Sequence, residues 1–197
     1  MTTATLATVR TSGVVLAGGA STRMGRDKAV LSFDGERLVD RAVSRLQEVA
    51  EDVVVASGRR TIAAVEVPQV RDLRGGSGPL SGLIAALLQV DHDLAHVLAV
   101  DLPHADPALF SALAGMWAGE AALIPSAGGR AQPLHAVWAT STAVGMSLLM
   151  ADGVRSVLRV AETMGARFLT DEETRDLVGD DRWAHNLNTP ADLLGDR

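Results

Sequence analysis

Cysteine is absent from this chain of 197 residues. Its absence excludes disulfides, thiolate metal sites and a cysteine nucleophile, and it fits a reducing compartment. Long apolar runs are absent too, since none approaches the ~20 residues that a membrane helix needs. The segment from Met1 to Ser12 also lacks the charged and apolar regions of a signal peptide. We therefore expect a cytoplasmic protein that does not contact a membrane.

Acidic residues outnumber basic ones, 24 to 18, and the formal net charge is −6. This balance argues against a nucleic-acid partner, although a local cationic loop can still bind a small polyanion. Only one of the 18 basic residues, Lys28, is a lysine. Lysine carries a compact point charge and arginine a planar fork, so Lys28 could mark a place where the fork does not fit. A single lysine that arose by chance is the alternative interpretation.

Apolar periodicity predicts alternating strands and helices. With 47% hydrophobic residues the chain can form a sizeable core, and we expect an N-terminal tail over 1–12 and a single domain over 13–197. Strands are predicted at 13–17, 52–57, 66–71, 96–100, 121–125, 133–139 and 167–170. Helices are predicted at 36–50, 78–90, 107–117 (with Asp106 as the cap), 141–150, 154–164 and from Thr189. The pattern indicates an α/β three-layer sandwich with a mostly parallel sheet.

The segment from Leu16 to Lys28 is a glycine-rich loop that follows the first predicted strand. Glycines let backbone N–H groups approach phosphate oxygens, and the hydroxyl and basic side chains of the loop add donors and charge. The loop fits neither the Walker A pattern nor the dinucleotide fingerprint G-x-G-x-x-G. It predicts a third kind of phosphate-binding loop, an ordinary βα turn with surface charges being the alternative.

Two acidic residues follow predicted strands: Asp72 closes the third and Asp101 the fourth. In an open parallel sheet, ligands bind beyond the carboxyl ends of the strands. Gly18, Asp72 and Asp101 would share that edge. Because Mg²⁺ prefers one or two carboxylates plus substrate phosphates, Asp101 is a candidate metal ligand. The alternative for each residue is a structural aspartate in a strand-end turn. For Asp72, the sequence favours neither ligand binding nor this structural role.

Three other features carry weaker signals. A predicted helix begins with Gly78, Pro79 and Leu80, and the free N–H groups at such a helix start favour an anion or a base carbonyl. The alternative interpretation is an ordinary flexible turn. Histidines and tryptophans have mostly structural readings: packing is the expected role of His135, and Asp91–Asp93 with His96 is expected to be solvated rather than a metal cluster. No order of Ser, His and Asp predicts a catalytic triad.

The loop from Leu16 to Lys28 resembles the L-A-G-G-x-S-x-R-M-G-x-D-K signature of the molybdenum cofactor guanylyltransferases, the MobA-like nucleotidyltransferase family. The resemblance continues, in the family's order and over nearly the whole chain, through Asp72 with 78–82, then 101–103, then 186–190. It implies a Rossmann-like nucleotidyltransferase fold. It also implies an enzyme that transfers GMP from GTP to molybdopterin, with Mg²⁺, giving molybdopterin guanine dinucleotide and pyrophosphate.

The resemblance also implies roles for individual residues. Arg23, Lys28 and Asp101 would be catalytic, with Asp101 on Mg²⁺, and Asn186 and Asn188 would lie on the molybdopterin side. Nucleotide contacts would come from Leu16, Ala17, Gly18, Gly19, Lys28, Asp72, Gly78, Pro79, Leu80 and Asp101. The expected partners are GTP, molybdopterin and proteins that deliver or receive the cofactor.

Three rival functions remain open. A CTP-dependent molybdopterin cytidylyltransferase would run the same chemistry, but the Gly18-Gly19 pair and 78–80 resemble the guanine version. A sugar-1-phosphate nucleotidyltransferase usually has a longer chain. A nucleotide-binding module without turnover would not need the metal carboxylate that Asp101 offers beside Lys28 and Asp72.

Overall fold

A seven-stranded sheet forms the centre of the molecule in the computed structural model, which describes residues 10–18, 28–72, 78–187 and 192. The strand order is β11-β7-β10-β6-β1-β4-β5. The strands are β1 (Thr11–Leu16), β4 (Asp52–Ala56), β5 (Gln69–Val70), β6 (Leu94–Ala99), β7 (Ala122–Ile124), β10 (His135–Ala139) and β11 (Arg167–Phe168). Neighbouring strands are parallel except that β10 runs antiparallel to β6 and β7. The predicted α/β fold with a mostly parallel sheet is confirmed.

The register brings the C-terminal ends of four parallel strands to one side of the sheet. Leu16 pairs with both Ala56 and Ala99, and Ala56 pairs with Val70. We call this side the carboxyl edge. β1 and β6 are buried at every position, as expected for parallel strands covered on both faces. Segments that leave the carboxyl edge therefore start from fixed points in the core.

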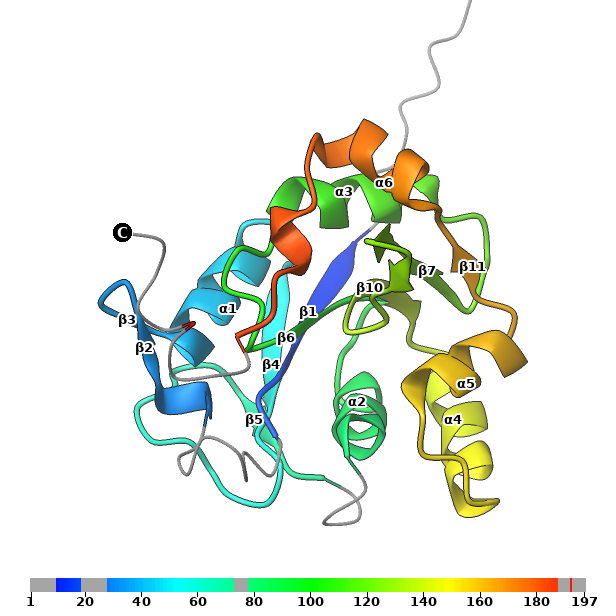
Figure 1. Cartoon of the computed structure of the whole chain (residues 1–197). Coiled ribbons are helices and arrows are strands. Elements are labelled where there is room, and N and C mark those ends of the chain that lie inside the picture. Colours follow the sequence, from blue (N-terminus) through cyan, green and yellow to red (C-terminus); the bar gives the residue numbers. More distant parts are fainter. Residues whose placement is uncertain (1–9, 19–27, 73–77, 188–191, 193–197) are drawn as a thin grey trace, which may run out of the picture.

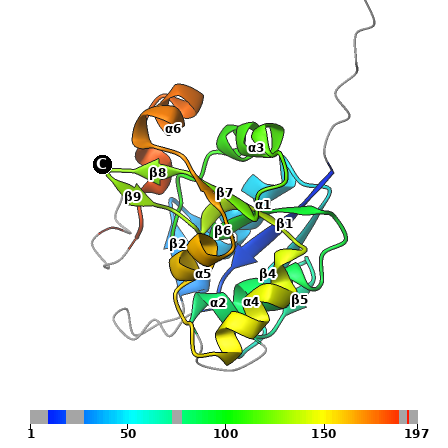
Figure 2. The ribbon, with the colours of Figure 1, turned by 90° about the vertical axis from the view of Figure 1, so that its right-hand side faces the viewer.

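Helices cover both faces of the sheet (Figures 1 and 2). On one face, α1 (Leu38–Gln47) and α3 (Pro107–Met116) pack on Val15, Val53 and Leu98. On the other face, α2 (Pro79–Leu87), α4 (Thr142–Ala151) and α5 (Val157–Thr163) pack on Val14, Val54 and Val97. Successive residues of β1 thus point to opposite faces of the sheet, with Val14 in one hydrophobic core and Val15 in the other. A further helix, α6 (Asp171–Val178), packs against α3. The predicted cap of α3 is confirmed, since the Asp106 side chain accepts a hydrogen bond from the Ala108 N–H at 2.8 Å.

Several element boundaries differ from the sequence-based expectation. The helix expected from residue 36 begins at Leu38, because β3 (Glu36–Arg37) pairs with β2 (Ser32–Phe33) across a turn whose two residues have positive φ. The strand expected at 66–71 is reduced to the two residues of β5, at the sheet's edge. The hairpin of β8 (Ser126–Ala127) and β9 (Arg130–Ala131), the helix α6 and the short 3-10 helices η1 (Lys28–Val30) and η2 (Arg182–Ala184) were not expected. The helix expected from Thr189 falls outside the described residues. Within the described part, every helix is too short or too polar to cross a membrane.

Candidate active site

The carboxyl edge brings together the sequence-predicted residues Gly18, Asp72 and Asp101. Backbone pairing continues past the strand ends, because the Ala17 N–H donates to the Ala56 carbonyl at 2.9 Å and the Val100 N–H donates to the Leu16 carbonyl at 3.2 Å. Asp101 follows directly. Asp72 is fixed by its own N–H, which donates to the Gly58 carbonyl at 3.0 Å. The predicted placement of these residues at one edge of the sheet is confirmed.

Lys28 joins three distant segments at this edge. Its Nζ lies 3.0 Å from Oδ2 of Asp101 and donates a second hydrogen bond, of 2.7 Å, to the backbone carbonyl of Leu187. The Leu187 N–H in turn donates to the Asp101 carbonyl at 2.9 Å. The two charged side chains are only 20% and 27% exposed, so solvent screens their attraction less than that of a surface pair. The sole lysine of the chain therefore lies beside the acidic group that follows β6.

Gly18 has a packing reason for being glycine. A Cβ at this position would lie 2.6 Å from the Gly58 Cα and 2.7 Å from its nitrogen. These are backbone atoms, so no rotamer change could relieve the overlap. The turn after β1 can therefore lie against the turn after β4 only without a side chain. Sequence reasoning attributed the loop's glycines to phosphate approach alone and missed this contact.

Asp72 lies against the first turns of α2. A Cβ on Gly82 would come within 3.1 Å of Oδ1 of Asp72, so the glycine leaves room for the carboxylate. Burial raises the pKa of Asp72, and the nearby Arg59 guanidinium opposes that shift. α2 itself begins with Gly78 as its N-cap, at φ 70°, and with Pro79 in its first turn. The N-terminal, positive dipole end of α2 therefore lies beside Asp72 at the carboxyl edge.

Other expected site residues are buried, exposed or outside the described part of the chain. Leu16, Ala17 and Leu80 are buried, so any contact with a ligand from them comes mainly from backbone atoms. Asn186 is exposed, next to Leu187 in the segment that Lys28 binds. Gly19, Arg23 and Asn188 lie outside the described residues. Sequence reasoning missed the Leu187 carbonyl, because a backbone acceptor leaves no signal in side-chain identity.

The histidines near the site are mostly structural. His135 is fully buried, stacks on Phe110 at 4.4 Å between ring centroids and meets Trp183 edge-on at 4.8 Å. Burial lowers the pKa of His135 to about 3 and that of His96 to about 4, which keeps both rings neutral. His92 lies near Glu51 and Asp52 at the N-terminal ends of the strands. The expected packing role of His135 is confirmed. The expectation that His96 is solvated is wrong, because it lies within β6, is 1% exposed and packs against Phe110. The described residues contain no cluster of three or more side chains suited to a metal.

A depression of about 560 Å³ borders the segments that flank the site. Its lining includes Phe33, His104, Arg182 and His185. His104 comes three residues after Asp101, and His185 comes just before Asn186. Three aspartates also line it, Asp34, Asp106 and Asp180, so its charges are mixed. Among the described residues, the hollow is polar and is lined by both positively and negatively charged side chains.

Comparison with known proteins shows that the chain is similar to nucleotidyltransferases. The family model for the MobA-like NTP transferase domain matches residues 13–168. A probable molybdenum cofactor guanylyltransferase of Pelotomaculum thermopropionicum is 30% identical over 94% of this chain and 91% of its own length. A protein of the same name from Bacillus cereus is 28% identical over 93% of this chain and 94% of its own.

Solved structures give the same picture. Molybdopterin-guanine dinucleotide biosynthesis protein A from Archaeoglobus fulgidus superposes with a TM-score of 0.79 at 27% identity, covering 93% of this chain and 95% of its own. The 2-C-methyl-D-erythritol 4-phosphate cytidylyltransferase of Thermus thermophilus has a TM-score of 0.63 at 15% identity, covering 92% and 94%. The second similarity concerns the fold alone.

Proposed function

The chain belongs to the MobA-like NTP transferase family, and on this premise we propose that it transfers GMP from GTP to molybdopterin, forming molybdopterin guanine dinucleotide and pyrophosphate. The chain is an enzyme of molybdenum cofactor biosynthesis, a nucleotidyltransferase. The observation that carries the finer proposal is the contact of Lys28 with Asp101 and Leu187. It unites the end of the glycine-rich loop, the acid after β6 and the segment that holds Asn186.

The nucleotide half of the site lies on the β1, β4 and β5 side of Asp101. We assign nucleotide contacts to backbone atoms of Leu16, Ala17 and Gly18, to Asp72 and to the start of α2. The glycine at position 18 supports this assignment, because it lets the turns after β1 and β4 approach each other. The N-terminal end of α2 suits an anion or the carbonyl of a base. Gly19, Gly78, Pro79 and Leu80 complete the proposed set.

The proposed reaction needs positioning and charge neutralisation rather than a proton carrier. An oxygen of the acceptor's phosphate attacks the α-phosphorus of GTP, a new P–O bond forms, and the bond to the β-phosphate breaks to release pyrophosphate. Lys28 and Arg23 offset the charge that grows on the leaving group. The attacking phosphate oxygen is already ionised, so no general base is required. The neutral, buried state of His135 and His96 agrees with this scheme.

The residues at the edge fit a magnesium ion. Asp101 offers one partly exposed carboxylate, and Mg²⁺ usually combines one or two carboxylates with waters and substrate phosphates. A protein cage of three ligands is therefore unnecessary, in line with the described residues. When bound there, the ion would neutralise phosphate charge, and Asp101 would hold it.

Calorimetric titration and pyrophosphate release test the proposal together. We expect GTP with Mg²⁺ to bind more tightly than CTP or ATP, and pyrophosphate to appear only when molybdopterin is also present. Tighter binding of CTP would replace the guanylyl assignment with a cytidylyl one. GTP binding without pyrophosphate release would indicate a nucleotide-binding module and overturn the proposed turnover.

A further inference from the structure

The hairpin of β8 and β9 lies at the carboxyl edge, on the side of β6 opposite to β1. It connects β7 to β10, and β10 starts at this edge because His135 pairs with Leu98 and the Ala99 N–H donates to the Leu134 carbonyl at 2.9 Å. The ends of β1, β4 and β5, which hold the proposed nucleotide contacts, lie on the other side of β6. Figure 2 shows the hairpin extending beyond the sheet in the direction in which β1 ends.

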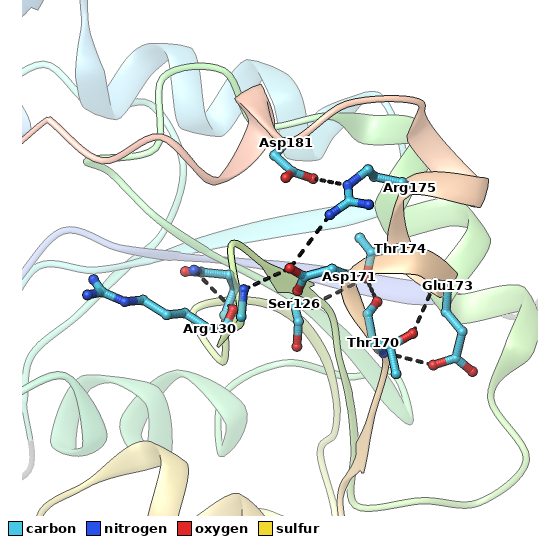
Figure 3. A network of polar contacts seen from close by, with 10 residues as sticks. Ser126, Arg130, Thr170, Asp171, Glu173, Thr174, Arg175 and Asp181 are labelled. Atoms are coloured by element: carbon cyan, nitrogen blue, oxygen red, sulfur yellow. Dashed lines mark hydrogen bonds and ion pairs between the residues drawn. The ribbon is translucent and has the colours of Figure 1, made fainter.

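The hairpin has a fixed conformation. Its turn residues Gly128 and Gly129 have φ values of 58° and 70°, which glycine adopts without strain. The Gly129 N–H donates to Oδ2 of Asp171 at 2.7 Å, and the Ser126 N–H donates to the Thr174 hydroxyl at 3.2 Å. Both acceptors belong to α6, as Figure 3 shows. The hairpin is therefore tied at two points to the start of a helix.

That helix start is itself well anchored. Thr170 and Glu173 form a reciprocal capping box at the N-terminus of α6, with hydrogen bonds of 3.1 Å and 2.7 Å. Arg175 lies 3.7 Å from Asp171 and 3.3 Å from Asp181 (Figure 3). The acids around the hairpin thus already have partners in α6 and in the hairpin's own backbone.

Arg130 is the only charged residue between Ser126 and Ala131. It is exposed, and Figure 3 shows its side chain extending away from the network around α6. Among residues 10–18, 28–72, 78–187 and 192, its guanidinium makes no hydrogen bond or ion pair. The backbone carbonyl of Arg130 accepts a hydrogen bond of 3.4 Å from the Gln132 side chain. A rigid hairpin therefore presents an uncompensated cation at the carboxyl edge.

We propose that Arg130 binds the phosphate group of the acceptor and so determines how the attacking oxygen is presented. The inference rests on the proposed function, because it needs a phosphorylated acceptor opposite the nucleotide half. A guanidinium binds a phosphate through two parallel N–H···O bonds and fixes its orientation as well as its charge. Arg130 lies across β6 from the nucleotide contacts, so its partner is the acceptor rather than the triphosphate.

Steady-state kinetics of the full chain with GTP, Mg²⁺ and molybdopterin test the proposal. Arg130→Gln removes the charge while keeping most of the stem, and Arg130→Lys restores the charge without the fork. We expect Arg130→Gln to raise the KM for molybdopterin at least about tenfold, as for the loss of a charge-assisted hydrogen bond, with the KM for GTP unchanged. Arg130→Lys should recover part of the loss. Arg159→Gln, which removes another exposed arginine, on α5, is the matched control and should behave as wild type.

The outcomes separate this inference from the proposed function. If the wild-type chain forms no dinucleotide, the proposed function fails and the assignment of Arg130 fails with it. If wild type turns over and Arg130→Gln matches Arg159→Gln, the function stands and the role of Arg130 is overturned. A rise in the KM for GTP equal to that for molybdopterin would likewise assign Arg130 to the nucleotide and overturn the inference. Thermal unfolding of each variant verifies that the hairpin change leaves the fold intact.

Discussion

At the scale of residues, Lys28 has a role that its charge alone does not explain. By contacting both the Asp101 carboxylate and the Leu187 carbonyl, it holds the end of the glycine-rich loop against the segment that carries Asn186. A guanidinium at this position would present a wider, planar group to two acceptors that now meet a single nitrogen. The contrast between one lysine and 17 arginines in the chain is therefore consistent with a geometric requirement.

Removing either charge of this pair should affect catalysis strongly. We expect Lys28→Ala and Asp101→Ala each to lower kcat at least ~100-fold, the usual cost of losing one preorganised charge in an active site. Pyrophosphate release with saturating GTP, Mg²⁺ and molybdopterin measures the effect. Arg155→Ala, whose guanidinium donates to backbone carbonyls near the end of α4, is a suitable control. A near-normal rate in either variant would remove that residue from the mechanism.

A second prediction at this scale concerns Gly18. An alanine there would drive its Cβ into the Gly58 backbone, at 2.6 Å, so the two turns must separate. We expect Gly18→Ala to destabilise the fold by about 1–3 kcal/mol, as for overpacking, and to weaken GTP binding. Urea denaturation and GTP titration report the two effects.

Gly115→Ala is the matched control for Gly18→Ala. A Cβ on Gly115, in α3, would meet nothing within 4 Å. Alanine favours a helix over glycine, so this variant should be about 0.5–1 kcal/mol more stable than wild type. If the two alanine variants had equal stabilities, the close approach of the turns after β1 and β4 would be wrong.

At the scale of elements, the short helix η2 is attached to the sheet through aromatic contacts. Trp183 is 2% exposed and meets His135 of β10 edge-on, and His135 stacks on Phe110 of α3. η2 comes just before His185, Asn186 and Leu187, so this stack positions the segment that Lys28 binds. Packing in the core thus supports the geometry of the site.

Truncating the tryptophan should therefore affect both stability and activity. We expect Trp183→Ala to lower the free energy of unfolding by about 3–5 kcal/mol, the range for a large aromatic side chain removed from a core. Turnover should fall even where the variant remains folded, because Leu187 loses its support. Urea melts and pyrophosphate release measure the two effects, and a folded variant with normal turnover would contradict the positioning role of η2.

The same stack predicts how stability depends on pH. Burial lowers the pKa of His135 to about 3 and that of His96 to about 4, whereas a histidine of the unfolded chain titrates near pH ~6.5. Below that pH the unfolded state takes up protons that the native state does not, so stability falls as the pH decreases. The loss should be about 1.4 kcal/mol per pH unit for each histidine until the native pKa is reached.

Denaturation in urea between pH 7 and 5 reports this effect, because ordinary carboxylates titrate mainly below pH ~4.5. His135→Phe retains an aromatic ring against Phe110 and removes one titrating group. We expect it to show a shallower loss of stability with falling pH than wild type does. An unchanged slope in this variant would mean that His135 is not buried in its neutral form.

Some elements could be predicted from sequence and others could not, for physical reasons. Buried strands such as β1, β4 and β6 are short β-branched or apolar runs, and their pattern is unambiguous. The hairpin β8–β9 has two residues in each strand, too few to show alternation. α6 is largely polar, with Thr174 as its only buried residue, so it lacks an apolar stripe, although its capping box between Thr170 and Glu173 is readable in the sequence.

At the scale of the whole molecule, the topology assembles a site from segments far apart in the chain. Strand order brings the residues after β1, β5 and β6 to one edge, which sequence reasoning could anticipate from the rule for parallel sheets. The contact between Lys28 and Leu187, separated by 159 positions, depends on how η2 packs and could not be anticipated. The strand order also places the proposed nucleotide contacts and the proposed acceptor contact of Arg130 on opposite sides of β6.

One competition experiment tests the central claim most directly. The enzyme is incubated with molybdopterin, Mg²⁺ and equal concentrations of GTP, CTP and ATP, and the dinucleotide formed is identified by mass spectrometry alongside the pyrophosphate released. We predict molybdopterin guanine dinucleotide, with pyrophosphate in equal amount. A cytosine dinucleotide as the main product, or no dinucleotide from an enzyme that binds GTP, would contradict the guanylyltransferase assignment.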